Sequence, residues 1–257
     1  MARKIFDLSV PIEQASFAQP VVIHRLDHKE GARQLGKTIG VNPGDFPDGR
    51  LLALETVTAS VHAGTHLDAP WHFGPLCGGK PSKTISDIPL EWCYGDGVVL
   101  DVSHRKAGTS ITVDDLKAAL TRIRYRIKPW DIVLIRTGAD RYLNDVDYVE
   151  RHPGMSREAT LWLIDQGVKV MGTDGFGFDK PFKVMAEEHR AGVEGALWPS
   201  HMVGREREYL HLEKLAHLDR LPRPHGFKIA AFPIDVEGAG AGWVRAVAIF
   251  EDLGEEE

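Results

Sequence analysis

The sequence predicts an α/β fold, in a single domain with a mixed sheet and flanking helices. Strand and helix patterns alternate along the chain, and no internal repeat or low-complexity linker interrupts them. The chain has 257 residues, of which 43% are hydrophobic and 26% charged, which suffices for one large buried core. We therefore expect one domain over residues 1–257.

The first half of the chain shows three strand patterns and one helix pattern. Leu51 to Thr58 mixes apolar and β-favouring residues, and Gly97 to Val102 has the composition of a buried strand. Thr112 followed by Asp115 forms a helix-capping pattern. An apolar stripe of helical spacing follows the cap: Leu116, Ala119, Leu120 and Ile123. Asp131 to Ile135 then predicts another strand.

The second half continues the alternation. Ser156 is placed to cap a helix that Gly167 ends, and Val168 to Met171 predicts the strand that follows. Lys228 to Phe232 and Trp243 to Phe250 predict terminal strands. The last of these has apolar residues on both faces, so we expect it to lie inside the sheet rather than at its edge.

The charge and the termini point to a cytoplasmic protein that acts on small molecules. A formal net charge of −6 disfavours binding to nucleic acid or to an anionic membrane. No secretory signal pattern begins the chain, and no uncharged apolar run approaches the ~20 residues of a membrane span. Cys77 and Cys93 are expected to be free thiols, and Glu255 to Glu257 a frayed acidic tail.

The strongest chemical signal is the segment 62–72. It carries three imidazoles and one carboxylate: His62, His66, Asp68 and His72. A straight strand rising ~3.3 Å per residue would separate His62 from Asp68 by roughly 20 Å, too far for one metal ion. The segment must therefore bend, and Gly64 and Pro70 are residues that permit a turn and end a strand. A helix would scatter these side chains around its circumference, so an extended, bent segment is the better interpretation.

This donor set indicates a divalent metal site. A single histidine is more often an ordinary polar residue than a ligand, but three histidines and an aspartate at this density favour coordination. Imidazole and carboxylate without cysteine suit Zn²⁺ or Mn²⁺, and three such ligands leave a position open for water. Thr65 is available to hydrogen-bond a ligand. The segment thus predicts a catalytic rather than a structural metal site.

The same segment resembles the signature His-x-Gly-Thr-His-x-Asp-x-Pro-x-His of the metal-dependent cyclase-like hydrolase family, of the kynurenine formamidase and isatin hydrolase type. Every specified position matches. Further blocks resemble the family: Asp7 to Ser9 with Pro11, Asn42 to Asp45, Arg136 to Gly138, and Gly172 to Asp179. The chain departs from the family pattern at Asn42, where kynurenine formamidases tend to carry Trp, and at Gly175 and Gly177, where Thr and Ser are common. An apparent insertion lies between Pro11 and Asn42.

The resemblance implies a swivelling β/β/α fold, a homodimer or higher homo-oligomer, and a centre with one or two ions. It implies five metal ligands, of which Asp68 serves both ions: His62, His66, Asp68, His201 and Glu213. His72 is then the general base rather than a primary ligand. His211 rivals His201 because it shares a strand face with Glu213, but the family spacing of twelve positions to Glu213 favours His201.

Such a centre predicts hydrolysis of a small amide C–N bond, in a cyclic amide or an N-formyl aromatic amine. Lactone hydrolysis, or cyclisation or dehydration of a small organic acid, is the alternative, and a non-catalytic metal-binding protein is a third hypothesis. The chain lacks Gly-x-Ser-x-Gly and His-Glu-x-x-His, which disfavours a serine hydrolase or a common zinc peptidase. The Gly172 to Asp179 turn either brings Asp174 or Asp179 near the metal or is purely structural, and for the loop Glu237 to Gly242 we favour a structural role over substrate contact.

Overall fold

The computed structural model describes residues 3–12 and 19–251, and these form two compact units. The larger unit contains residues 1–18 and 61–257, of which 3–12 and 61–251 are described, and the smaller contains residues 19–60. The expectation of a single domain over the whole chain stays a prediction. The acidic tail from Glu255 to Glu257 lies outside the described residues.

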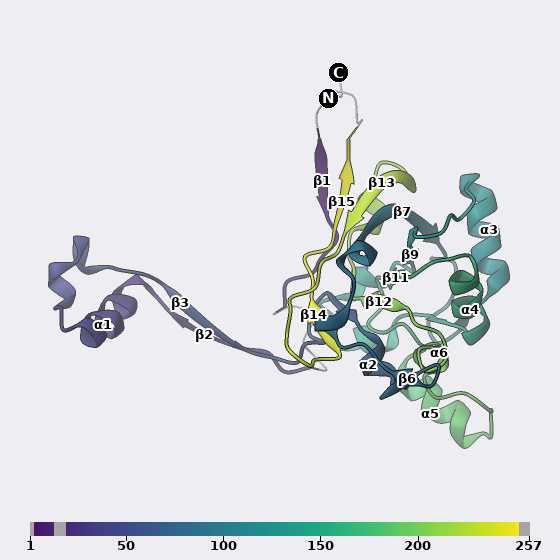
Figure 1. Ribbon diagram of the computed structural model, residues 1–257, viewed down its shortest axis with the longest axis horizontal. Helices are drawn as coiled ribbons and strands as arrows, with labels where there is room; N and C mark the ends of the chain where they lie inside the picture. The colour runs from purple at the N-terminus through teal and green to yellow at the C-terminus, as the bar shows by residue number, and fades with distance from the viewer. Residues whose placement is uncertain (1–2, 13–18, 252–257) are drawn as a thin grey trace. The chain divides into compact units, whose positions relative to one another are not determined.

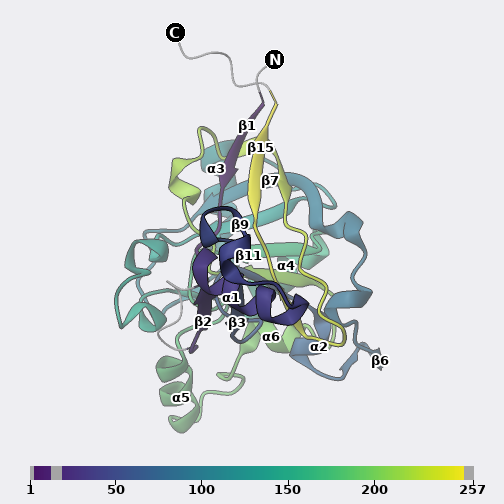
Figure 2. The same cartoon turned by 90° about the vertical axis from the view of Figure 1, so that its left-hand side faces the viewer.

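The larger unit is built on a nine-stranded sheet in the order β1-β15-β13-β7-β9-β11-β12-β4-β14. The strands are β1 (Lys4–Asp7), β4 (His66–Asp68), β7 (Tyr94–Asp101), β9 (Ile132–Arg136), β11 (Val170–Thr173), β12 (Leu210–Glu213), β13 (His225–Ala230), β14 (Ala241–Trp243) and β15 (Val247–Phe250). The four strands β7, β9, β11 and β12 are parallel, and the remaining pairings are antiparallel. The mixed sheet is confirmed, and the first and last strands, β1 and β15, lie side by side (Figures 1 and 2).

Helices connect the parallel strands, because a parallel pair needs a long crossover. They are α3 (Val113–Ile123), α4 (Arg157–Asp165), α5 (Phe182–Arg190) and α6 (Pro199–Val203), whereas the short helix α2 (Pro70–Phe73) follows the antiparallel strand β4. Both predicted caps form: Thr112 accepts from the Asp115 amide in a capping box, and Ser156 accepts from the Ala159 amide. Two short ribbons complete the unit, β5 (Leu76–Cys77) with β6 (Lys80–Pro81) and β8 (Ser110–Ile111) with β10 (Gly154–Met155).

The sheet separates two apolar clusters because side chains alternate along each strand. On β9, Val133 and Ile135 pack with Leu116 of α3 and Leu163 of α4, and these helices lie side by side over that face in Figure 1. The intervening Leu134 belongs to the second cluster, which is lined by residues of the curled sheet itself, among them Leu67, Leu212, Ile229 and Phe250. The site described below lies at β4 and β12, on the face opposite Leu67 and Leu212, which is the face that carries the first cluster.

The predicted strand from Trp243 to Phe250 is wrong as a single strand. β14 ends at Trp243 and pairs with β4, whereas β15 begins at Val247 and pairs with both β1 and β13. Between them the Val244 amide donates to the Thr65 carbonyl, and the Ala246 carbonyl accepts from the Leu8 amide. The segment thus joins β14, at one end of the strand order, to β15, near the other end. The expectation that β15 is paired on both sides is confirmed.

The smaller unit contains β2 (Val22–Leu26), α1 (His28–Ile39), β3 (Leu54–Thr58) and two 3₁₀ turns, Pro43–Asp45 and Pro47–Gly49. Asp27 caps α1 by accepting from two amides, and β2 pairs with β3 in an antiparallel ribbon. The strand predicted from Leu51 thus forms only from Leu54 and belongs to this unit. His66 and Asp68, two of the predicted ligands, therefore lie on a strand of their own, β4, rather than at the end of β3, and His62 lies in the turn before β4. None of the helices in the described residues is long and apolar enough to cross a membrane.

Candidate metal centre

The register between two strands determines which side chains form the buried part of the site. β4 and β12 are antiparallel neighbours, with Asp68 opposite His211 and His66 opposite Glu213. Residues two apart on a strand point to the same face, so these four side chains converge on one side of the sheet. All four are buried, with exposed fractions of 0% for His66, Asp68 and His211 and 7% for Glu213.

The turn before β4 brings His62 back to the same place. Gly64 has φ of +64°, in the left-handed region that glycine tolerates, so the predicted turn is confirmed. A Cβ at this position would also lie 3.1 Å from the Cα of Ile12. His62 Nδ1 consequently lies 3.0 Å from Asp68 Oδ1. The segment is bent and extended as far as Asp68, and Pro70 then begins the short helix α2 that carries His72.

His201 reaches the site from α6 and is held by Asp179. The His201 Nδ1 donates to Asp179 Oδ2 at 2.5 Å, and the same carboxylate accepts from the backbone amides of Ser200 and His201. With the proton on Nδ1, the lone pair of Nε2 faces Glu213 Oε1 at 3.8 Å. A carboxylate that orients a histidine in this way is the usual outer-shell partner of a metal ligand.

Of the two aspartates in the Gly172 to Asp179 turn, Asp179 approaches the site and Asp174 does not serve it. Asp174 accepts hydrogen bonds from the Thr137 amide and hydroxyl and from the Gly138 amide. Its carboxylate therefore ties the Thr137 to Gly138 loop to the end of β11, which is a structural role.

The two oxygens of Asp68 face different histidines. Oδ1 lies 3.0 Å from His62 Nδ1 and 3.4 Å from His66 Nε2, whereas Oδ2 lies 3.0 Å from His211 Nε2. Burial alone would raise the pKa of Asp68, but the surrounding histidines outweigh it and hold that pKa well below its usual range. The carboxylate is therefore ionised and able to bridge.

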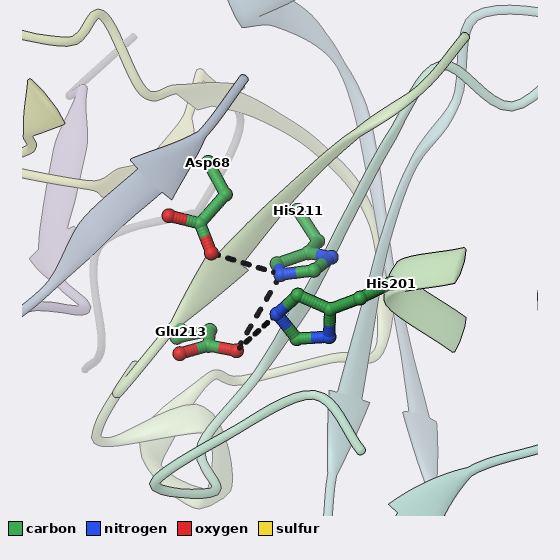
Figure 3. Close-up of side chains that lie close together, drawn as sticks. All are labelled: Asp68, His201, His211 and Glu213. Carbon is green, nitrogen blue, oxygen red and sulfur yellow. Dashed lines mark hydrogen bonds and ion pairs between the residues drawn. The ribbon is translucent and has the colours of Figure 1, made fainter. Parts of the chain in front are cut away.

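The two oxygens of Glu213 also face different histidines. Oε2 lies 3.6 Å from His66 Nε2, whereas Oε1 lies 3.4 Å from His211 Nε2 and 3.8 Å from His201 Nε2. The Phe178 amide donates to Oε1 at 2.8 Å and fixes the carboxylate. Figure 3 shows Asp68, His201, His211 and Glu213 turned toward one another. The two carboxylates thus stand between a proximal pair of imidazoles, His62 and His66, and a distal pair, His201 and His211.

The donors fit a divalent ion. His66 Nδ1 donates to the Gly64 carbonyl at 2.9 Å, so the lone pair is on Nε2, which is buried and has no hydrogen-bond partner among the described residues. One ligand atom from each of Asp68, His201, His211 and Glu213 lies within 4.8 Å of the others, and the same holds for His62, Asp68 and His72. Tetrahedral bonds of ~2.0–2.1 Å place ligand atoms ~3.4 Å apart, close to the observed separations.

His72 lies on the solvent side of the centre. Its ring centroid is 4.3 Å from that of His62 and 5.4 Å from that of His201. Partial desolvation by the surrounding protein and the nearby imidazoles lower the pKa of His72 to about 4, although the residue keeps exposed surface. His72 is therefore neutral at pH 7. The loop before β14 packs behind it, since a Cβ at Gly240 would lie 3.1 Å from the Cα of His72.

The structure brings together all the residues that the sequence predicted for the site, and it adds His211 to them. His211 was predicted only as a rival to His201, yet both rings lie at Glu213. Lys214 was missed: its side chain is buried and Nζ donates to the His62 carbonyl at 2.8 Å. Its position directly after Glu213 is the one signal in the sequence. Of the two aromatic residues beside His72, Phe73 is buried in the core and Trp71 is 46% exposed.

Comparison with known proteins decides the family. Residues 6–180 match the model of the family described as a cyclase. The chain belongs to this cyclase family. The match includes the segment from His62 to His72 and also Asp179, and it stops before His201, His211 and Glu213.

Members with known names are distant in sequence. The chain is 26% identical to a kynurenine formamidase of Geobacillus thermodenitrificans over 233 residues, 84% of this chain and 93% of the relative. It is 26% identical to an isatin hydrolase of Roseibium aggregatum over 215 residues, 79% of this chain and 76% of the relative. The activities that these names denote, on a formamide and on isatin, belong to those relatives.

Solved structures show the same fold. An isatin hydrolase A from Ralstonia solanacearum matches with a TM-score of 0.75 at 24% identity, covering 97% of this chain and 92% of that chain. An isatin hydrolase bound to the product analogue thioisatinate matches with a TM-score of 0.74 at 21% identity, covering 97% and 93%. The fold that the sequence resemblance implied is confirmed.

Proposed function

We propose that the protein is a metal-dependent hydrolase that cleaves a small amide C–N bond, in a cyclic amide or an N-formyl aromatic amine. The observation that carries this proposal is the unpartnered Nε2 of His66, a buried lone pair that faces the carboxylates of Asp68 and Glu213. An arrangement of this kind is costly unless a cation completes it. Hydrolysis of an amide is also supported by the family match and by the similarity to a kynurenine formamidase and an isatin hydrolase.

The proposed ligands are His62, His66 and Asp68 for one ion and Asp68, His201 and Glu213 for a second. Zn²⁺ and Mn²⁺ both suit imidazole and carboxylate donors. A bound divalent ion would lower the pKa of water and polarise the amide carbonyl. The chain itself orients the donors: Asp179 fixes the ring of His201, and the Phe178 amide fixes Glu213.

His72 is the proposed general base. Its ring is neutral at pH 7 and borders both His62 and His201, so it can take a proton from the attacking water and deliver it to the leaving nitrogen. Its place on the solvent side of the buried carboxylates leaves it free to contact substrate.

A second candidate reaction uses the same centre for lactone hydrolysis or for cyclisation or dehydration of a small organic acid. One solved structure of the same fold, with a TM-score of 0.62, is described as a potential metal-dependent hydrolase with cyclase activity. The departures from the family pattern at Asn42 and in the insertion before it favour testing several substrates, since specificity can change while the metal chemistry is preserved.

We also expect a homodimer or a higher homo-oligomer. Within the smaller unit, every residue of β3 is exposed, including Leu54 and Val57. A two-stranded ribbon is only marginally stable alone, so a second copy of the chain is the expected neighbour. Light scattering coupled to gel filtration tests this, and a monomer at micromolar concentration would contradict it.

The first test is elemental analysis of the purified protein, paired with assays on N-formylkynurenine, isatin and a simple lactone. Activity is measured after chelation and again after Mn²⁺ or Zn²⁺ is restored. Amide cleavage that returns with the metal is the expected result. Bound metal with lactone turnover alone would favour the second reaction, and a protein that takes up no metal under any loading condition would overturn the proposal.

A further inference from the structure

His211 is fixed by its strand and by the aromatic rings around it. It lies on β12 opposite Asp68, and its ring is completely buried. The ring stacks on Phe178 with centroids 4.4 Å apart and an interplanar angle of 12°, and Phe73 lies 5.1 Å away on centroids. Side chains fixed by packing on a sheet are the precise kind of support that a metal ligand needs.

The hydrogen bonds of His211 leave Nε2 directed at the carboxylates. Tyr209 donates its hydroxyl hydrogen to the Ser200 carbonyl at 2.8 Å, so the Tyr209 oxygen accepts from His211 Nδ1 at 3.3 Å. A proton on Nδ1 leaves Nε2 as the ring atom that faces the carboxylates, where a bound cation would take the place of its proton. That atom lies 3.0 Å from Asp68 Oδ2 and 3.4 Å from Glu213 Oε1.

The distal donors form a closed set. All four residues are buried: Asp68, His201, His211 and Glu213. Their ligand atoms lie within 4.8 Å of one another, and the ligand atoms of a tetrahedral Zn²⁺ site lie ~3.4 Å apart. The proximal site is more open, because the side chain of His62 is 22% exposed and the neighbouring His72 faces solvent.

We infer that His211 is a fourth protein ligand of the distal ion, beyond the ligands that the signature and its distal partners supply. The inference rests on the proposed metal-dependent function and deepens it. With Asp68, His201, His211 and Glu213 as ligands, a distal Zn²⁺ would have four protein donors, whereas the proximal site would keep room for water. Water activation would then belong to the proximal site, with Asp68 as the carboxylate that the two sites share.

Two consequences can be measured. A weak chelator should remove the solvent-reached proximal ion first and abolish turnover while one ion per chain remains. Removing His211 should weaken the distal ion by more than about 100-fold, beyond the ~10–100-fold loss typical of residues that only orient a ligand.

The experiment compares the metal content of the wild type, His211→Gln, His62→Gln and the control His189→Gln during stepwise dialysis against a weak chelator, starting from Zn²⁺-loaded protein. His189 lies in the last turn of α5 and is exposed, so its variant should follow the wild type. Thermal unfolding of the metal-free proteins checks that each variant folds. Replacing Zn²⁺ by Co²⁺ adds a spectroscopic readout, since loss of a ligand changes the intensity of the visible bands.

We expect His211→Gln to lose the tightly held ion and His62→Gln to keep it. A His211→Gln protein with the metal content, Zn²⁺ affinity and Co²⁺ spectrum of the wild type would overturn the inference while leaving the proposed function intact. A wild type with a single ion that His62→Gln loses and His211→Gln keeps would overturn it as well. A wild type that binds no metal would instead defeat the proposed function.

Discussion

The proximal and distal halves of the metal centre are built by different means. His62 and His66 come from one short segment, and a left-handed Gly64 with a local hydrogen bond sets their geometry. His211 and Glu213 owe their positions to β12 and its register with β4. A turn-built half depends on a few local residues, whereas a sheet-built half depends on the assembly of distant strands. Substitutions should therefore affect the two halves to different extents.

Breaking the proximal half should have the largest effect. His66→Ala removes the unpartnered Nε2 between the two carboxylates, so we expect metal and activity to be lost together. The loss of a metal's charge stabilisation, several kcal/mol, corresponds to at least about 10⁴-fold in kcat/KM. Elemental analysis with amide-hydrolysis kinetics measures this, and His189→Ala is the matched control. Full metal content with full activity would rule out His66 as a ligand.

His72→Ala separates the base from the ligands beside it. We expect substantial metal to remain while kcat falls by about 10²–10⁴-fold, the usual contribution of a general acid or base. Metal content and kcat measured on the same preparation distinguish the two roles. Metal loss equal to that of His66→Ala would make His72 a ligand of the proximal half.

Asp179→Asn weakens the distal half without removing a ligand. The substitution loses the charge that holds His201 Nδ1, and we expect about 10–100-fold weaker binding of the distal ion. Competition with a chromogenic chelator gives the affinity. Wild-type affinity would show that the packing of α6 suffices to orient His201.

Asp174→Asn tests the second aspartate of the same turn, which should leave metal binding unchanged. Burial raises the pKa of Asp174 to about 7, although Thr137 and Gly138 donate hydrogen bonds to its carboxylate. Between about pH 4 and pH 7 the folded chain thus holds a proton that the unfolded chain releases. The contribution of Asp174 to stability therefore falls as pH rises, by at most about 1.4 kcal/mol per pH unit.

Urea unfolding of the metal-free wild type and Asp174→Asn at pH 5, 6 and 7 measures this contribution. The free energy of unfolding of the variant minus that of the wild type should rise with pH. A difference that stays constant with pH would mean that the donors from Thr137 and Gly138 keep Asp174 ionised throughout.

The same contrast explains what could be predicted from the sequence. The turn-built half is local, so the spacing of His62, His66 and Asp68 with Gly64 was enough to predict its convergence. Helix caps at Thr112 and Ser156 are local too, and both predictions were confirmed. The crossing between Trp243 and Val247 depends on partners such as Leu8 and Thr65, which lie far away in the chain, and no local pattern indicates it.

For the distal half, the period of two along a strand placed His211 and Glu213 on one face, but it could not say that His201 would join them. That arrangement requires α6 to lie over β12 and Asp179 to turn the His201 ring. Lys214 was missed for the same reason, since the groups that contact its buried ammonium, the His62 carbonyl and the Phe176 ring, lie far away in the chain.

The pairing of Asp68 with His211 joins positions 143 residues apart. At a synthesis rate of ~5–20 residues per second, the ribosome releases the second partner roughly 7–30 s after the first. Throughout that interval the nascent chain carries histidines that can hold a cation only weakly. Tight retention of metal becomes possible when β12 pairs beside β4 in the correct register, because a slip of one residue would turn His211 and Glu213 to the opposite face. Tight retention of metal thus indicates that β12 has paired with β4 in the correct register.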